Sequence, residues 1–211
     1  MYSVGPPLVP GVVLGHFGAM SDHYIFGYGS LVNCATHAYR ETHTAQLQGW
    51  RRVWQHTTKR DVAFLNVVPD EHCVIDGLMM AVPREAPELA AREYAYGKFD
   101  VTHQVRTAEI EAGEVNLWSI PSEDRSTTGA PPAVLLSYID VVIAGYLDHF
   151  GRDGAARFFA TTSGWNVPIW DDRAQPQYPR AQPLTGKVRA IVDAALGDLP
   201  CWIMQPGSSP R

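Results

Sequence analysis

A glycine-containing turn near the start of the sequence is the first place where the chain could bind a ligand. Residues 27–31 read G-Y-G-S-L and follow an aromatic and β-branched run that predicts a strand over residues 24–28. Glycine tolerates positive φ angles, so a strand that ends this way can turn sharply and aim consecutive backbone N–H groups into one hollow. Such a hollow binds an anion, for example a carboxylate, with donors that never titrate. A plain strand-ending turn explains the same pentapeptide equally well.

Glu93 is the second candidate because it lies within A-A-R-E-Y-A-Y, a segment with high helix propensity. A carboxyl among small and aromatic neighbours can be partly buried, and burial raises its pKa toward the range of a base near neutral pH. A solvated glutamate paired with Arg92 or Lys98 is the alternative interpretation. The residue types alone do not separate Glu93 from three other glutamates, Glu85, Glu88 and Glu109.

Cysteine and metal chemistry are less favoured. Cys34 follows the glycine turn and could be a nucleophile, but the sequence defines no base for it, and an inert buried thiol is the commoner role. Among the eight histidines, the nearest pair is His37 and His43, and no carboxylate or thiolate at a supporting spacing makes that pair a metal site. The motifs of zinc proteases, serine hydrolases and P-loop proteins are absent from the sequence. We therefore expect no metal.

The composition is that of a single globular domain. The chain has 211 residues, of which 45% are apolar and 18% charged, and its net charge is −5. An acidic surplus does not attract a polyanion, so nucleic acid is not expected as a partner. No run of about 18 apolar residues occurs, so the sequence predicts no membrane span. The three cysteines lack a C-x-x-C spacing, which favours a reducing, cytoplasmic location over a disulfide framework.

The ends of the sequence differ from its middle. Residues 1–20 contain apolar residues, as a secretory leader does, but they lack a basic start, and three prolines would break a helix there. We expect a flexible extension over residues 1–20, with Met20 as a possible natural start. A single domain is expected over residues 21–205, followed by a flexible tail over residues 206–211.

The order of elements favours an α+β fold in which strands come early and helices late. We expect a small sheet, closed or nearly closed, with helices packed outside it. After residues 24–28, the patterns predict strands at 46–58, 63–68, 73–82 and 114–120, with a turn at 69–71, and alternation at 99–106. They predict helices at 88–96, at 134–150 before a capping Gly151, at 153–159, and at 185–196 between Thr185 and Gly197.

Two loops separate the later elements. Residues 121–132 are rich in Ser, Thr, Gly and Pro and predict a loop. Residues 163–183 contain four prolines and predict an irregular surface segment. The aromatic side chains of this second segment could cover a pocket, cover a subunit contact or simply pack on the surface: Trp165, Trp170 and Tyr178.

Four short motifs occur in a fixed order along the first half of the chain. They are F-G-Y-G-S-L at residues 26–31, R-R-V-W-Q at 51–55, V-I-D-G-L-M at 74–79 and R-E-Y at 92–94. In these motifs the chain resembles the γ-glutamylcyclotransferase family, and most of all its ChaC-related branch, over roughly residues 24–105. The resemblance implies a small mixed β-barrel surrounded by helices. It also implies an enzyme that releases 5-oxoproline from γ-glutamyl amides or peptides without a metal or an organic cofactor.

The resemblance also assigns roles to individual residues. It implies that Glu93 is the catalytic glutamate, which takes a proton from the substrate's α-amine as that amine attacks its own γ-carbonyl, and returns it to the leaving amine. Tyr28 and Tyr96 could be walls of the pocket or could serve packing alone. The backbone expected to hold the α-carboxylate and amine of the γ-glutamyl group is that of Gly27, Tyr28, Gly29, Ser30, Leu31 and Val32.

The substrate stays open at this level. Residues 56–61 read H-T-T-K-R-D and depart from the stretch found in glutathione-directed members. A γ-glutamyl amino acid or a γ-glutamylated small amine is therefore as compatible as glutathione. A non-catalytic module that binds γ-glutamyl or other carboxylate ligands is the alternative function, and hydrolysis through Cys34 is a third. The oligomeric state does not follow from the sequence.

Overall fold

A computed structural model describes residues 23–39, 41–55, 62–83, 86–92, 96–110, 113–121 and 132–205. The expected N-terminal extension at 1–20, the tail at 206–211 and the proposed catalytic residue Glu93 lie outside the described residues. Within the described ranges, no helix is long and apolar enough to span a membrane.

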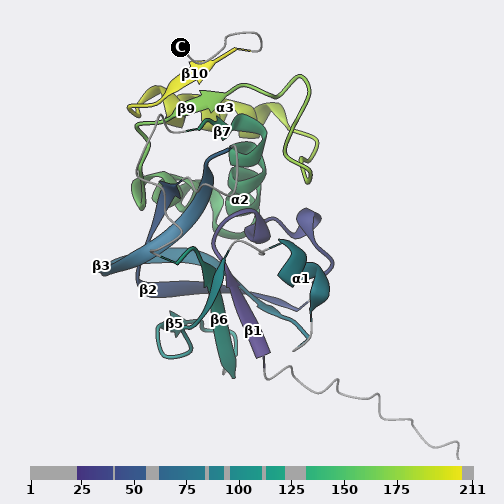
Figure 1. Cartoon of the computed structure of the whole chain (residues 1–211), viewed down its shortest axis with the longest axis vertical. Coiled ribbons are helices and arrows are strands. Elements are labelled where there is room, and N and C mark those ends of the chain that lie inside the picture. Colours follow the sequence, from purple (N-terminus) through teal and green to yellow (C-terminus); the bar gives the residue numbers. More distant parts are fainter. Residues whose placement is uncertain are drawn as a thin grey trace, which may run out of the picture.

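The main layer is a mixed seven-stranded sheet (Figure 1). Its strands follow the order β4-β6-β1-β3-β2-β5, and β8 pairs with β2; the pairs β1–β6 and β2–β8 are parallel. No closed barrel is found among the described strands, in which β4 and β5 end the path. The α+β class is thus confirmed, whereas the barrel stays a prediction. The strand bounds are β1 His23–Gly27, β2 Thr42–Gln55, β3 Phe64–Ala81, β4 Gly97–Asp100, β5 Val105–Arg106, β6 Glu114–Ser119 and β8 Thr162–Ser163.

Strands β2 and β3 form a long antiparallel pair, and the turn predicted at residues 69–71 is wrong. β3 runs through Pro69, which faces Trp50 of β2. The register shifts beside this pair, between Gln48 and Trp50, where Gly49 adopts a φ of 85°. A bulge of this kind accommodates a proline, which has no N–H for the ladder. The turn-forming residues thus lie inside β3, where Pro69 pairs with Trp50 and residues 70–73 have no register partner in β2.

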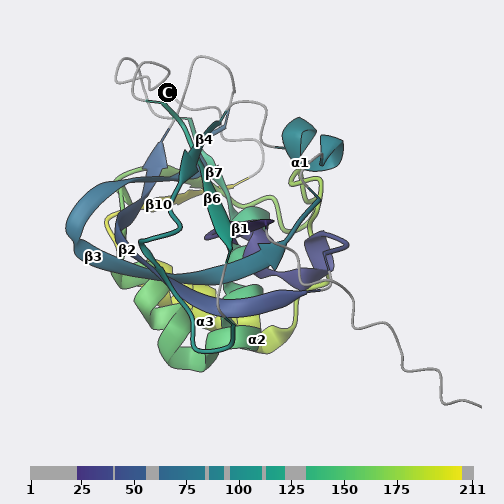
Figure 2. The same ribbon diagram turned by 90° about the horizontal axis from the view of Figure 1, so that it is seen from below.

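Helices α2 (Leu136–Ala160) and α3 (Gly186–Gly197) contact each other and lie together on one side of the sheet (Figure 2). The helix break predicted at Gly151 is confirmed, because this residue has a φ of 64° and a non-helical ψ within α2. The predicted cap at Thr185 is also confirmed, since its side chain accepts a hydrogen bond from the backbone N–H of Val188. The short helix α1 (Pro87–Arg92) lies apart from α2 and α3 (Figures 1 and 2).

A second, three-stranded sheet lies beyond α2 at the C-terminal end of the described chain (Figure 1). It contains β7 (Val134–Leu135), β9 (Pro168–Trp170) and β10 (Trp202–Met204), paired in parallel with β9 in the middle. The sequence did not predict this sheet, because strands of two or three residues carry too short a pattern to detect.

Candidate functional site

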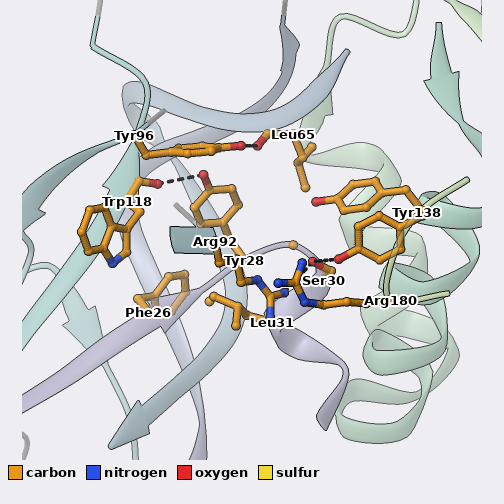
Figure 3. Close-up of a pocket in the computed structure, with 13 residues that line it drawn as sticks. Phe26, Tyr28, Ser30, Leu31, Leu65, Arg92, Tyr96, Trp118, Tyr138 and Arg180 are labelled. Carbon is orange, nitrogen blue, oxygen red and sulfur yellow. Dashed lines mark hydrogen bonds between the residues drawn. The ribbon is translucent and has the colours of Figure 1, made fainter. Parts of the chain in front are cut away.

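A pocket of about 100 Å³ opens where β1 ends (Figure 3). The structure brings nearly all of the sequence-predicted binding residues to it: Gly27, Tyr28, Gly29, Ser30, Leu31 and Tyr96. Val32 is fully buried and does not line the pocket. Glu93 lies outside the described residues, although its neighbour Arg92 lines the pocket. The other described lining residues are Phe26, Leu65, Trp118, Tyr138, Tyr178 and Arg180.

The segment G-Y-G-S-L at residues 27–31, called the glycine loop below, continues into a short 3-10 helix at Ser30–Val32. Backbone bonds close this turn from Val32 N–H to the Gly29 carbonyl at 2.9 Å and from Asn33 N–H to the Ser30 carbonyl at 3.1 Å. The first N–H groups of a helical turn have no partner inside it. In the described part of the chain, no hydrogen bond is found from the N–H groups of Gly29, Ser30 or Leu31. The loop therefore presents donors that a ligand can use.

The two glycines of the loop are required for space. The sequence suggested that they adopt positive φ angles, and this is wrong for Gly29, whose φ is −120°. A Cβ atom on Gly29 would lie 2.7 Å from the hydroxyl of Tyr138. A Cβ atom on Gly27 would lie 2.5 Å from the Met80 methyl group. Close approach of neighbouring side chains, not backbone conformation, thus explains the glycines.

A buried arginine holds the glycine loop from its core side. Arg52 is fully buried, and its Nε donates to the Tyr28 carbonyl oxygen at 3.1 Å. Its Nη2 also donates to the hydroxyl of Tyr146 and to the carbonyl of Asp76. The carbonyl and the following N–H of a trans peptide point in opposite directions. Because the Tyr28 carbonyl points toward Arg52, the N–H of Gly29 points away from the core, on the pocket side. The sequence offered the motif that contains Arg52 but no role for it.

Tyrosine side chains form the walls of the pocket and are tied to the backbone. The Tyr28 hydroxyl donates to the carbonyl of Trp118 at 2.8 Å, and the Tyr96 hydroxyl donates to the carbonyl of Leu65 at 3.2 Å. The ring of Tyr138 packs edge-on against that of Tyr178, with centroids 5.0 Å apart. The phenol groups of Tyr28 and Tyr96 therefore hold fixed positions (Figure 3).

The end of the pocket near Ser30 is positively charged. Arg92 Nη2 donates to Ser30 Oγ at 2.8 Å, and the Tyr178 hydroxyl donates to the same oxygen at 2.8 Å. The guanidinium groups of Arg92 and Arg180 both point toward Ser30 (Figure 3). Among the lining residues that the structure describes, none is acidic. This arrangement attracts an anionic ligand.

Cys34 is not part of this pocket. Its Sγ lies 3.4 Å from Nε2 of His149, on α2, and neither residue lines the pocket. His37 contacts the Leu31 carbonyl and His43 contacts Glu109, so the nearest pair of histidines does not converge. Within the described ranges, no cluster of three or more His, Cys, Asp or Glu residues could hold a metal ion.

The segment that contains the glycine loop is similar to a known protein family. Residues 23–108 match the family model described as ChaC-like protein. This segment is ChaC-like. The resemblance to the γ-glutamylcyclotransferase family, and to its ChaC-related branch, is thereby confirmed. The ChaC-like segment includes β1, the glycine loop, Arg52 and Arg92.

Solved structures share the fold at low sequence identity. A structure titled gamma-glutamyl cyclotransferase has a TM-score of 0.52 and 13% identity, and the alignment covers 82% of this chain and 98% of that one. The uncharacterized protein loc79017 from Homo sapiens gives a TM-score of 0.51 at 13% identity, with 81% and 97% covered. YkqA from Bacillus subtilis gives 0.51 at 17% identity, covering 64% of this chain and 51% of YkqA, so the alignment spans about half of YkqA's length. A comparison with curated proteins gives no significant match.

Two of the lining residues come from outside the ChaC-like segment. Tyr178 and Arg180 belong to the irregular stretch at 163–183, for which the sequence left a pocket cover, a subunit contact and surface packing open. Tyr178 reaches the pocket, whereas Trp165 packs in the core against Trp54 at 5.4 Å between ring centroids. No sequence signal linked Tyr178 to Ser30, because 148 positions separate them.

Proposed function

We propose that the protein is a γ-glutamylcyclotransferase-type enzyme that releases 5-oxoproline from a γ-glutamyl peptide, amino acid or amide. The observation that carries this proposal is the 2.8 Å hydrogen bond from Arg92 Nη2 to Ser30 Oγ. It joins the R-E-Y motif to the G-Y-G-S-L motif at one pocket. Each motif alone is weak, but the proposed chemistry needs both at the same place.

The loop binds the head of the substrate in this proposal. The N–H groups of Gly29, Ser30 and Leu31 hold the α-carboxylate, since they have no partner in the described chain. Ser30 Oγ accepts hydrogen bonds from Arg92 and Tyr178, which leaves its own proton available for the ligand. With the carboxylate held there, the γ-glutamyl chain can bend so that its α-amine reaches the γ-carbonyl.

The reaction then needs one group that moves a proton. The α-amine nitrogen attacks the γ-carbonyl carbon, the bond to the leaving nitrogen breaks, and the products are 5-oxoproline and a free amine. Glu93 takes the proton from the attacking amine and gives it to the leaving amine, which contributes about 10²–10⁴-fold in rate. Holding the chain bent contributes more, since well-oriented intramolecular attack is worth about 7–11 kcal/mol. The assignment of Glu93 rests on the family motif and on the place of Arg92 beside it.

No metal or organic cofactor enters this scheme, as the family resemblance implies. The proposed partner is the small γ-glutamyl substrate itself. A cytoplasmic location stays a prediction from the cysteine content.

The test is an assay of the purified protein with glutathione and a panel of γ-glutamyl dipeptides, with 5-oxoproline as the measured product. Glu93→Gln keeps the shape of the side chain and removes the base, so we expect its kcat to fall about 10²–10⁴-fold. Glu71→Gln is the matched control, because Glu71 is highly exposed on β3 and does not line the pocket. Full activity in Glu93→Gln would show that the catalytic assignment is wrong. Saturable binding of γ-glutamyl compounds without any turnover would instead support the non-catalytic carboxylate-binding module.

A further inference from the structure

We propose that Asp172 is a positioning residue for the pocket: it holds Tyr178 against Ser30 and thereby raises the affinity for the γ-glutamyl head group. This inference rests on the proposed function, in which Ser30 and its neighbours hold the α-carboxylate. Asp172 lies outside the ChaC-like segment, which ends at residue 108, and it does not line the pocket.

Asp172 has a buried carboxylate that accepts hydrogen bonds from two separate parts of the chain. Its side chain is 3% exposed. Its Oδ1 accepts from the backbone N–H of Ser137 at 2.8 Å, and its Oδ2 accepts from the Ser137 hydroxyl at 2.5 Å. The same Oδ2 accepts from the N–H of Gln177 at 2.8 Å. Hydrogen bonds to a carboxylate are stronger than those between neutral groups, so Asp172 fixes Gln177 relative to the start of α2.

The two residues that Asp172 joins are the immediate neighbours of two pocket tyrosines. Ser137 precedes Tyr138, and Gln177 precedes Tyr178. The two tyrosine rings pack edge-on with their centroids 5.0 Å apart, and both line the pocket (Figure 3). A shift of Gln177 away from Ser137 would therefore also move the ring of Tyr178 away from that of Tyr138.

The tyrosine pair faces consecutive residues of the glycine loop. The Tyr138 hydroxyl lies beside Gly29, because a Cβ atom there would come within 2.7 Å of it. The Tyr178 hydroxyl donates to Ser30 Oγ at 2.8 Å, and Arg92 Nη2 donates to the same oxygen. These two donors occupy the acceptor sites of Ser30 Oγ and leave its own proton for the ligand. Without Tyr178 in place, one acceptor site is open and the Ser30 hydroxyl is free to rotate.

A second contact keeps the segment that carries Tyr178 attached when Asp172 is changed. Arg173 donates to both carboxylate oxygens of Asp140 on α2 at 2.8 Å, and to Asp193 on α3 at 2.6 Å. These bonds hold the start of the segment, whereas Tyr178 lies five positions further on. Loss of the Asp172 bonds should therefore loosen Tyr178 without detaching the segment.

The first test is the substitution Asp172→Asn, which keeps the size of the side chain. An amide has one acceptor oxygen and one NH2 donor, so in either orientation it loses a hydrogen bond from a backbone N–H. For γ-glutamyl-alanine we expect KM to rise roughly 3- to 10-fold while kcat stays within about 2-fold of the wild type, because the group that moves the proton is unchanged. Val192→Ala is the control for lost stability, since Val192 is fully buried on α3 and does not line the pocket. Its KM should equal that of the wild type.

A double-mutant cycle separates positioning from a purely structural role. Tyr178→Phe removes the hydroxyl that bonds to Ser30 Oγ. If Asp172 acts through this hydroxyl, Asp172→Asn should raise KM much less in the Tyr178→Phe background than in the wild type. Equal effects in the two backgrounds, or a wild-type KM in Asp172→Asn, would overturn the inference.

Thermal unfolding of each variant verifies that it is folded. If Asp172→Asn does not fold, Ser137→Ala takes its place in the same cycle, because it removes one of the two hydrogen bonds to Oδ2 of Asp172. A smaller rise in KM that depends on the Tyr178 hydroxyl would support the inference, and a wild-type KM would overturn it.

The same variants distinguish this inference from the function on which it rests. If the wild type releases no 5-oxoproline from any γ-glutamyl compound, the proposed function fails, and the cycle is measured as calorimetric binding of γ-glutamyl-alanine. Weaker binding in Asp172→Asn that disappears in the Tyr178→Phe background supports the positioning role, and additive losses overturn it. A wild type that does not bind this compound overturns both proposals.

Discussion

Arg52 Nε donates a hydrogen bond to the carbonyl oxygen of Tyr28 at 3.1 Å, and thereby connects a fully buried cation to the loop that lines the pocket. The neighbouring Arg51 lies on the opposite face of the same strand, where it pairs with Asp70 and is 36% exposed. Two consecutive arginines of one motif therefore have different environments, and substitution should distinguish them.

Arg52→Met should lower the free energy of unfolding by about 2–4 kcal/mol, because it removes the donor from buried acceptors such as the Tyr28 carbonyl. Arg51→Met should cost about 0–1 kcal/mol, the usual range for an ion pair near the surface. Urea denaturation of both variants measures the difference. Equal losses would contradict a special role for the buried arginine.

Gly29→Ala should impair substrate binding, because the added Cβ would lie 2.7 Å from the Tyr138 hydroxyl. Overpacking of this kind typically costs about 1–3 kcal/mol, so we expect KM to rise by roughly 10-fold or more. Tyr138→Phe removes the oxygen that the Cβ meets. The double variant Gly29→Ala/Tyr138→Phe should therefore recover part of the lost affinity relative to Gly29→Ala. Strictly additive effects of the two substitutions would refute this explanation of the glycine.

Tyr146 should control stability at alkaline pH. Burial raises the pKa of its phenol to about 12. Because the folded pKa exceeds the unfolded value of about 10, the neutral phenol contributes its full stability below pH 10. This contribution is lost as the pH rises from about 10 to about 12.

Tyr146→Phe removes this titration. The variant should be less stable at pH 7, since it loses the hydrogen bonds to the carbonyls of Tyr28 and Asp76. It should then lose less further stability than the wild type as the pH rises from 10 to 12. Chemical denaturation at several pH values gives both curves, and parallel curves over this interval would contradict the prediction.

The sequence predicted those parts of the structure that depend on neighbouring residues. The helix break at Gly151 and the cap at Thr185 follow from local backbone chemistry, and both are present. The residues of the glycine loop were found for the same reason, since a short motif carries them.

The sequence did not predict the features that depend on contacts between residues far apart in the chain. Pro69 and Asp70 are typical turn residues, but Pro69 pairs with Trp50 of β2 and the side chain of Arg51 donates to Asp70. Tyr178 and Arg180 belong to a segment that Asp172 ties to the start of α2 and that Tyr178 ties to Ser30. Contacts over such separations leave no periodic pattern in a single sequence.

The hydrogen bond between Tyr178 and Ser30 means that the pocket is built from two regions that are made at different times during synthesis. A nascent chain that has emerged only through the ChaC-like segment has the glycine loop but lacks one wall of the pocket. The glycine loop and its buried arginine therefore come from the earlier region, and the wall that Tyr178 forms comes from the later one.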